Sequence, residues 1–395
     1  MTAVQAMVSL VVIMVPVFAV AAPDIGVDAR IVGFYSALVY TVSTLSAPIG
    51  GQLTDRIGPV RTSQICMLVV AVGIALVATA WLPLVALGAM LMGAGNGPAT
   101  PASTYILSRR TPPRLMSLVL SIKQTGAALG IAIAGATVPF MVVAMGWQGA
   151  ALVGAGISLV VAVALEALRK DMDRDVHAAH GSGVAKRPSA LAGLGLILRN
   201  RRLAVMAACS FSFCVFQIAV TSYFVTFLVE EIGIDKAKAA YLFSIAVTVG
   251  AAVRVAVGAL ADWLGDRSGV LAALGLGMGA CAVWFMFLTR GTAIWEIAVL
   301  GVVFACVSMT WTGVFLAEIM PFVPQQQTGG VTGAVMIFFY AGSVVGPGLF
   351  GVILTATGSY SSAFAAVGVP AFLSGGAFLV LRRRGRSGPS SPASA

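Results

Sequence analysis

The chain contains 395 residues, of which 59% are hydrophobic and only 10% are charged. Because an ordinary soluble domain has about a quarter charged residues, this composition excludes a soluble globular fold. The net charge of +10 could suit a nucleic-acid-binding protein, but the basic residues fall mostly between apolar runs and are not interleaved with aromatic residues. We therefore expect a membrane protein with no nucleic-acid partner.

The apolar runs are about 20 residues long and continuous, which predicts an all-α membrane protein. Residues 7–24 resemble a secretory signal but lack a basic start, so we interpret them as part of a first membrane helix. Clusters of charge and Gly/Pro breaks then separate twelve apolar segments, at approximately 4–22, 31–53, 62–81, 83–107, 116–143, 148–168, 203–228, 239–261, 270–288, 293–316, 328–354 and 360–381.

The distribution of Lys and Arg predicts the orientation of these twelve helices. Of the 24 basic residues, 18 fall in the loops after even-numbered segments or in the C-terminal tail, and four fall in the loops on the opposite side. Positive charge marks the cytoplasmic side of a membrane protein. Both termini are thus predicted to be cytoplasmic, in the inner membrane of a bacterium.

The longest hydrophilic stretch, residues 169–202, predicts a division into two halves. The expected organisation is a six-helix bundle at 1–168, a flexible cytoplasmic linker, a second six-helix bundle at 203–381 and a cytoplasmic tail at 382–395. His177 and His180 in the linker are too few for a metal site. All five cysteines lie inside apolar segments, so neither a metal nor a cofactor is expected.

A turn with the sequence G-Q-L-T-D-R-I-G-P-V-R-T at residues 51–62 recurs in weaker form in the second half. Asp55 and Asp262 are 207 residues apart, and Gly51 and Gly58 have counterparts at the same offset. Two further pairs that follow matching segments, Pro112/Pro321 and Gly126/Gly342, are separated by 209 and 216 residues. Such nearly constant spacing indicates a duplicated architecture.

Twelve helices in two repeats, with G-x-L-x-D-R-x-G-x-x-R after the second helix, resemble the major facilitator superfamily. The resemblance implies that the turn acts as a conformational latch, in which Asp55 lies near a helix N-terminus of the other half. Arg56 and Arg61 would pair with acidic residues or lipid phosphate. The alternative is a tight positive-inside turn without a role in gating.

This chain departs from the family pattern at the turn. Pro59 and Val60 precede Arg61 where basic residues are common, and Trp263 follows Asp262 where Arg56 follows Asp55. The candidate gating residues are Gly51, Asp55, Arg56, Gly58, Arg61 and Asp262, and the role of the second turn is the less secure.

Two basic residues lie inside apolar segments. Lys123 in the fifth segment and Arg254 in the eighth lie at similar depth, roughly 10 and 12 Å from the cytoplasmic ends of their helices. A cation in a membrane helix costs about 2.5 to 3.5 kcal/mol and normally has a partner, but no acidic residue of the sequence is placed as deep. The pair therefore predicts an anionic substrate, held by Arg254 through two parallel bonds and by Lys123 as a point charge.

Other interpretations of these two cations stay open. Lys123 could extend its amine toward the cytoplasm, and Arg254 could satisfy backbone carbonyls or form a conformational ion pair. In the resembled family, helices 5 and 8 face each other between the two halves, and some organic-anion members use an arginine of helix 8 with a second cation. Here the second cation would come from helix 5, whose repeat counterpart is Phe339.

Weaker candidates for the substrate site are Asn96, Gln124 and Tyr340. Asn96 lies in the stretch G-A-G-N-G-P-A-T-P, where glycine and proline are expected to open the fourth helix and expose backbone to a cavity. Ordinary packing is the alternative for each of the three.

The sequence contains no phosphate-binding loop, zinc-protease motif or hydrolytic triad, so an enzyme is not expected. The leading hypothesis is a secondary transporter that moves a small organic anion by alternating access, as a monomer, with protons or a counter-anion and membrane lipid as further partners. One alternative is a proton-coupled exporter of drugs or metabolites, which usually requires a membrane-embedded carboxylate. Another is a receptor that binds solute without moving it.

Overall fold

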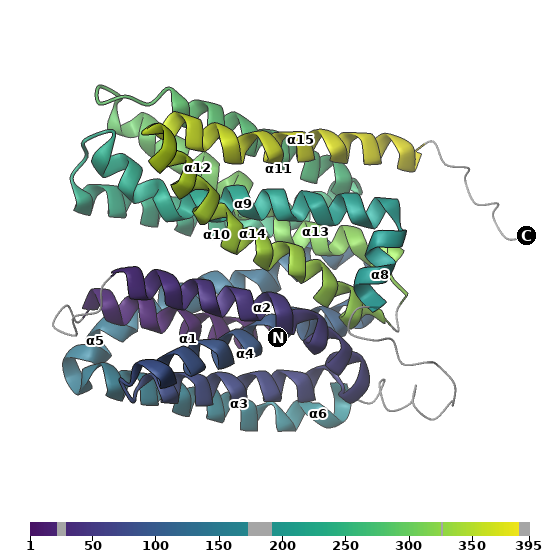
Figure 1. Ribbon diagram of the computed structural model, residues 1–395. Coiled ribbons are helices and arrows are strands. Elements are labelled where there is room, and N and C mark those ends of the chain that lie inside the picture. Colours follow the sequence, from purple (N-terminus) through teal and green to yellow (C-terminus); the bar gives the residue numbers. More distant parts are fainter. Residues whose placement is uncertain (22–28, 173–191, 325–326, 387–395) are drawn as a thin grey trace, which may run out of the picture.

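The chain folds into long helices that lie side by side (Figure 1). The computed structural model describes residues 1–21, 29–172, 192–324 and 327–386, and these ranges contain no strand. The first half comprises α1 (Thr2–Ala21), α2 (Ala29–Ile57), α3 (Pro59–Val77), α4 (Leu82–Arg110), a 3-10 turn (Pro113–Leu115), α5 (Met116–Ala164) and α6 (Glu166–Met172). The second half comprises α8 (Ala192–Arg199), α9 (Arg201–Glu230), α10 (Lys236–Leu264), α11 (Arg267–Met286), α12 (Ile294–Ser308), α13 (Trp311–Ile319), a 3-10 turn (Met320–Phe322), α14 (Thr328–Thr357) and α15 (Tyr360–Arg386).

The predicted all-α membrane fold is confirmed. Within the described ranges, nine helical stretches are long and apolar enough to cross a membrane. Two predicted segments are joined in α5, where Gly146 has a φ of 74° that reverses the chain. One predicted segment is divided into α12 and α13 by the non-helical residues Met309 and Thr310.

Helix ends in the second half follow from local sequence. Asn200 and Asp235 each accept hydrogen bonds from the first free N–H groups of α9 and α10, as expected for N-cap residues. Gly265 and Gly358 adopt the left-handed conformation that terminates α10 and α14.

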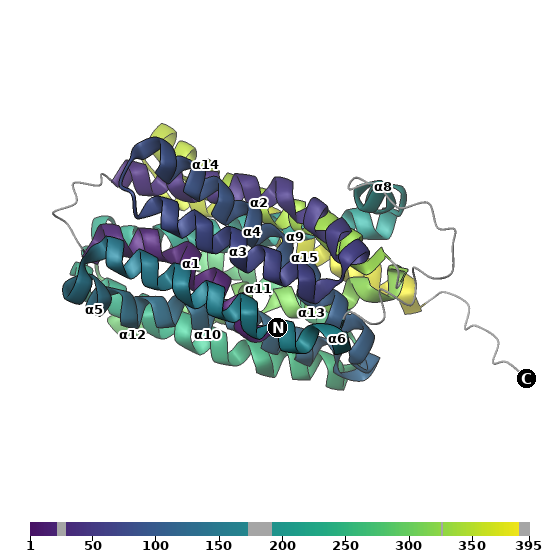
Figure 2. The ribbon, with the colours of Figure 1, turned by 90° about the horizontal axis from the view of Figure 1, so that it is seen from below.

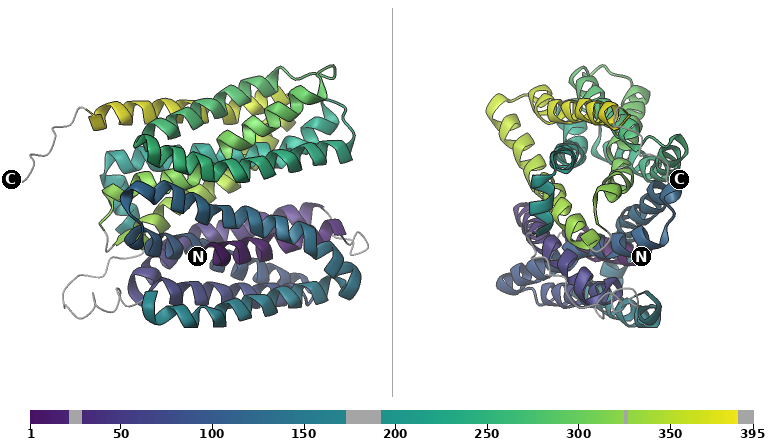
Figure 3. Two further views of the ribbon diagram at one scale, coloured as in Figure 1. Left: turned by 180° about the vertical axis from the view of Figure 1, so that it is seen from behind. Right: turned by 90° about the vertical axis from the view of Figure 1, so that its right-hand side faces the viewer.

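The two halves form two layers, most clearly when the molecule is seen from behind (Figure 3). Buried side chains of α1 to α5 form one apolar cluster, and those of α8 to α15 form the largest. Ala47, Met116 and Leu120 of the first half belong to the cluster of the second. The layers meet where α2 and α4 pack against α14, and where α5 packs against α10 and α13.

One end of the molecule gathers most of the basic residues, and we call it the basic end. It is the end that carries α6, α8 and the last turns of α15 (Figures 1 and 2). There α2 ends at Ile57, α4 ends at Arg110 and α5 begins at Met116.

Both edges of the predicted linker are helical. Residues up to Met172 continue in α6, and α8 packs against the start of α14 through Gly193, where a Cβ would lie 2.4 Å from Gly330 O. The polar run that predicts a flexible linker, residues 170–183, lies almost entirely outside the described residues, whereas α8 after it buries an apolar face: Ile197 is fully buried. His177 and His180 lie outside the described residues.

The expected opening of the fourth helix is also wrong, since α4 is helical from Leu82 to Arg110. The glycines of this stretch instead allow α2 to approach closely. A Cβ on Gly93 would lie 2.4 Å from Val39 O, and one on Gly97 would lie 2.2 Å from Ser46 Oγ. Small residues at such contacts are typical of packed membrane helices.

Candidate functional site

The turn between α2 and α3 brings a carboxylate to a helix N-terminus of the other half. Asp55 accepts hydrogen bonds from Gly329 N (3.1 Å) and Gly330 N (2.8 Å) at the start of α14. These N–H groups have no partner within their own helix and carry partial positive charge, so they favour an anion.

Two glycines make the Asp55 contact possible. A Cβ on Gly51 would lie 2.2 Å from Gly329 O, closer than any real Cβ contact. Gly58 has a φ of 97°, a conformation that L side chains rarely adopt, and it lets α3 begin directly after α2.

The second turn, between α10 and α11, repeats this geometry. Asp262 accepts hydrogen bonds from Ser117 N (3.1 Å) and Leu118 N (2.8 Å) at the start of α5. Gly258, the counterpart of Gly51, approaches Ser117 and Ser121 closely enough that its Cβ would lie 2.5 Å from Ser121 Oγ. The weaker sequence motif therefore makes the same contact as the stronger one.

The arginines around the two turns differ in what they contact. Arg267 donates to Asp262 Oδ1 (2.9 Å), Ser117 Oγ (2.8 Å) and Pro113 O, and so joins the two halves. Arg56 is exposed at the surface of the basic end.

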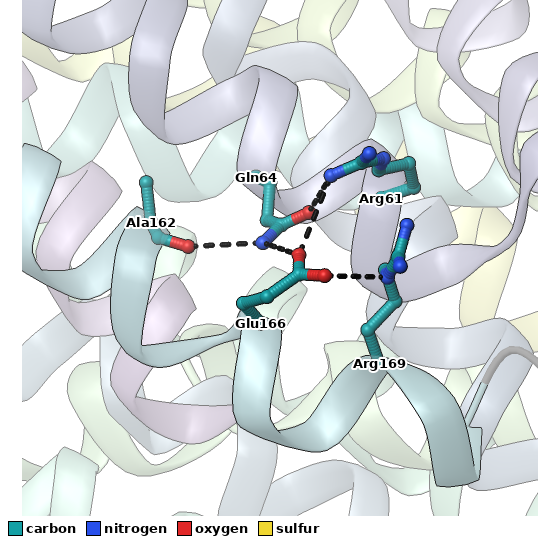
Figure 4. A network of polar contacts seen from close by, with 5 residues as sticks. All are labelled: Arg61, Gln64, Ala162, Glu166 and Arg169. Carbon is teal, nitrogen blue, oxygen red and sulfur yellow. Dashed lines mark hydrogen bonds and ion pairs between the residues drawn. The ribbon is translucent and has the colours of Figure 1, made fainter.

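Arg61 contacts residues of its own half. It lies 3.4 Å from Glu166 Oε2 and donates to Gln64 Oε1, while Gln64 and Arg169 also contact Glu166 (Figure 4). Gln64 Nε2 also donates to Ala162 O (3.1 Å), so this network ties the start of α3 to the end of α5 and to α6.

Deeper in the molecule, Lys123 is held inside the protein. Its side chain is 1% exposed, and Nζ donates to Gln124 Oε1 (2.7 Å) and to Thr100 Oγ1 of α4 (3.3 Å). The alternative in which Lys123 extends its amine to the surface is therefore wrong, since Thr100 and Gln124 provide acceptors at depth.

Arg254 links three helices at the same depth. Nε donates to Met309 O (2.7 Å) in the break between α12 and α13, and Nη1 donates to Gln124 O of α5 (2.7 Å). The side chain thus satisfies backbone carbonyls in this conformation, as the alternative interpretation expected. It also connects the two halves directly.

Asn96 and Tyr340 adjoin this cluster. Tyr340 of α14 donates to Asn96 O (3.4 Å), and Asn96 Nδ2 donates to Ser43 Oγ (3.1 Å). Asn96 precedes Thr100 by one helical turn of α4, so all five candidate substrate residues belong to one contiguous region.

Three members of the cluster were missed from the sequence. Thr100 accepts from Lys123 and contacts Gln5 of α1, at 3.4 Å, but threonine and glutamine in an apolar run are not distinctive. The spacing of Thr100 one turn after Asn96 could have indicated a shared face. Met309 acts through its backbone, which no residue type reveals.

The acceptors around the two cations are neutral. Lys123 and Arg254 are the only Lys, Arg, Asp or Glu residues that are buried as whole residues in the described structure, while the Asp262 carboxylate at the basic end has a side chain that is 4% exposed. Their contacts are a hydroxyl, an amide oxygen and two backbone carbonyls. Two positive charges joined through Gln124 can attract an anion, and two buried cations can provide it with several strong hydrogen bonds.

Comparison with known proteins agrees with this architecture. Residues 1–347 match the family model described as Major Facilitator Superfamily. The chain is 24% identical over 366 residues to the hexuronate transporter of Bacillus subtilis (strain 168), covering 88% of this chain and 86% of that protein. It is 39% identical over 75 residues to the 4-hydroxybenzoate transporter PcaK of Pseudomonas aeruginosa, covering 19% of this chain and 17% of that one.

Solved structures show the same fold. The fucose:proton symporter FucP of E. coli superposes with a TM-score of 0.72 at 18% identity, over 96% of both chains. The human organic anion transporter MFSD10 (TETRAN) superposes with a TM-score of 0.73 at 14% identity, over 95% of this chain and 97% of that one. The match over residues 1–347, together with the paired six-helix layers, identifies this chain as a member of the Major Facilitator Superfamily, an integral multi-pass membrane transporter and not an enzyme.

Proposed function

We propose that this protein moves small organic anions across the membrane by alternating access, with Lys123 and Arg254 as the anion-binding residues. The observation that carries this proposal is the pair of buried cations whose described acceptors are all neutral. A carboxylate is a better acceptor for both groups than a hydroxyl or a carbonyl, because its negative charge adds Coulomb attraction and it can accept two parallel hydrogen bonds from the guanidinium. Asn96, Gln124 and Tyr340 would complete the site.

The names of two relatives point to the same chemistry. Hexuronate and 4-hydroxybenzoate, which the related transporters are named for, are both carboxylates. A proton-coupled drug exporter has less support, because the hydrogen bonds of Lys123 and Arg254 in the described structure involve no Asp or Glu, and the largely buried carboxylate of Asp262 lies at the basic end.

The two turns would act as latches at the basic end. Asp55 and Asp262 each hold a helix start of the opposite half, with Gly51 and Gly58 allowing the approach in the first turn. Arg61 would stabilise the first turn from within its own half, and Arg56 would face lipid phosphate or solvent. In this proposal, residues 1–168 and 203–381 rock as units, joined by 169–202.

The basic end would face the cytoplasm of a bacterium, since positive charge is retained on that side. Both termini, including the tail at 382–395, would then be cytoplasmic. In the described conformation both aspartates join the two halves at this end, which would be the closed state of the latches.

Uptake by purified protein in liposomes tests the proposal. Wild-type protein should accumulate labelled carboxylates, and Arg254→Gln should lower the uptake rate at sub-saturating substrate roughly 10- to 100-fold, as expected for losing a charged hydrogen bond. Lys123→Gln should act similarly. The matched control is Lys236→Gln, which removes an exposed positive charge at the opposite end.

Two results would refute the anion site. One is normal carboxylate uptake by Arg254→Gln, and the other is uptake of cations alone by the wild-type protein.

A further inference from the structure

The duplicated architecture allows the two sides of the candidate site to be compared position by position. At the 207-residue offset of the two aspartates, Arg254 of α10 corresponds to Ala47 of α2. At the 216-residue offset of the paired glycines, Lys123 of α5 corresponds to Phe339 of α14. Each buried cation thus has a neutral counterpart.

The cations and their counterparts lie at two different interfaces between the halves. Lys123 and Arg254 lie where α5 packs against α10, and they are linked through Gln124. Ala47 and Phe339 belong to α2 and α14, which pack together on the other side. The positive charge of the site therefore lies on one side, at the α5/α10 interface. We call Lys123 and Arg254 the cationic wall, and the residues of α2 and α14 at the other interface the opposite wall.

The opposite wall carries aromatic rings at the corresponding depth. Tyr40 of α2 stacks on Tyr340 of α14, with ring centroids 6.4 Å apart and planes at 29°. Phe339 packs edge-on against Tyr340, with centroids 5.4 Å apart. Tyr40 and Phe339 are half-buried, and both contact Tyr340, so the three rings form one aromatic group at this interface.

A chain of contacts connects the aromatic wall to the cationic wall in both directions. On one side, Tyr340 donates to Asn96 O, one helical turn before the Thr100 hydroxyl that accepts from Lys123. On the other side, Phe339 lies 5.9 Å from the ring of Trp311. Trp311 begins α13 two residues after Met309, whose carbonyl accepts from Arg254. The two groups of residues are thus connected through α4 on one side and through α13 on the other.

We propose that the substrate of this site is a carboxylate attached to a flat aromatic ring, with the carboxylate on Lys123 and Arg254 and the ring against Tyr40, Phe339 and Tyr340. This inference rests on the proposed function and names the substrate class. Aromatic rings pack favourably against one another in offset or edge-on arrangements. A sugar acid would instead turn several hydroxyl groups toward Phe339, which has no group to bond them, and unpaired hydroxyls are unfavourable away from water.

Competition between labelled benzoate and galacturonate in liposomes containing the full chain tests this inference. Wild-type protein should prefer benzoate over galacturonate by at least tenfold in kcat/KM, with cyclohexanecarboxylate between them. Phe339→Leu keeps an apolar side chain but removes the ring, so it should raise the KM for benzoate and lower the preference about fivefold. Phe339→Tyr keeps the ring and should retain the preference.

The matched control is Phe140→Leu, which changes a phenylalanine on the outer surface of α5 that is 77% exposed. It should leave the preference unchanged. Thermal stabilisation of each purified variant by benzoate shows whether a variant that does not transport still folds and binds.

The outcomes separate this inference from the proposed function. A wild-type preference for galacturonate, or an unchanged preference in Phe339→Leu, would overturn the aromatic class. If uptake still depended on Arg254 in that case, the anion site itself would stand. Absence of any carboxylate uptake would overturn both.

Discussion

The α2/α14 and α5/α10 interfaces are nearly equivalent at the basic end and different at depth. At the basic end each joins an aspartate to two backbone N–H groups, with distances of 3.1 and 2.8 Å in both cases. At depth one interface carries Lys123 and Arg254, while the other carries aromatic rings. A protein that opens and closes between two similar halves needs matching contacts at both interfaces. A site that binds one asymmetric solute needs different residues on its two sides.

Among the contacts of the basic end, the largest expected effect comes from preventing closure at either interface. Gly51→Val and Gly258→Val place a Cβ where backbone or side-chain oxygen now lies within 2.2 and 2.5 Å. Because the two halves cannot then meet, uptake should fall at least about 30-fold, a change of roughly 2 kcal/mol in the closed state. The measurement is initial uptake by reconstituted protein of verified thermal stability.

Gly135→Val is the control for these substitutions, since a Cβ there meets nothing within 4 Å. Normal uptake by Gly51→Val would show that this interface tolerates separation.

A smaller effect is expected from neutralising the aspartates. Asp55→Asn and Asp262→Asn each retain one acceptor oxygen but point an amide toward an N–H donor, which should destabilise the closed basic end by about 1 to 2 kcal/mol. Distances between spin labels across the basic end, with and without substrate, report the resulting shift in population.

Asp262→Asn should have the larger effect of the two aspartate variants. It also removes the carboxylate partner of Arg267. Equal populations in the wild type and both variants would show that these contacts do not hold the closed state.

Arg267→Gln tests what the second interface gains from its arginine. Arg267 joins Asp262, Ser117 and Pro113, and the side chains of its ion pair with Asp262 are only 17% and 4% exposed. Its loss should reduce uptake about fivefold, consistent with the roughly 1 kcal/mol net contribution of a hydrogen bond within a protein. Arg201→Gln, which removes an exposed arginine at the same end, is the control. An effect as large as that of Asp262→Asn would mean that the ion pair, rather than the N–H contact, dominates.

The smallest effect is expected from a contact within one half. Glu166→Gln breaks the network with Arg61 and Arg169, whose side chains are 48% and 35% exposed. Exposed ion pairs contribute about 0 to 1 kcal/mol, so the thermal midpoint should fall slightly. The distances between spin labels across the basic end should not change. A change in these distances would show that this network also stabilises the closed state.

The membrane fold and its duplication can be predicted from local patterns in the sequence. Continuous apolar runs predict membrane helices because lipid offers the backbone no hydrogen-bond partners. The repeated aspartates and glycines predict the duplication because their spacing survives even where neighbouring residues differ, as at Arg56 and Trp263.

Breaks in helices were harder to predict than helices. The stretch around Pro98 and Pro101 predicts an opening, yet α4 is helical throughout, and its glycines pack closely against α2. The break that does occur, at Met309 and Thr310, contains neither glycine nor proline. There Thr310 Oγ1 donates to Cys306 O (2.7 Å), a side-chain bond that competes with the helical N–H and bends helices.

By itself the sequence determined the membrane class, the two-repeat family and the two buried cations, because hydrophobicity, spacing and charge are properties of residue type and order. Only the tertiary structure decided which groups surround those cations and that both turns make equivalent contacts. It also decided that Lys123 and Arg254 lie at the α5/α10 interface, and that Tyr40 and Tyr340 stack at the α2/α14 interface. These properties depend on which helices of the two halves meet, and on backbone groups such as Met309 O and Gly330 N, which every residue type carries alike.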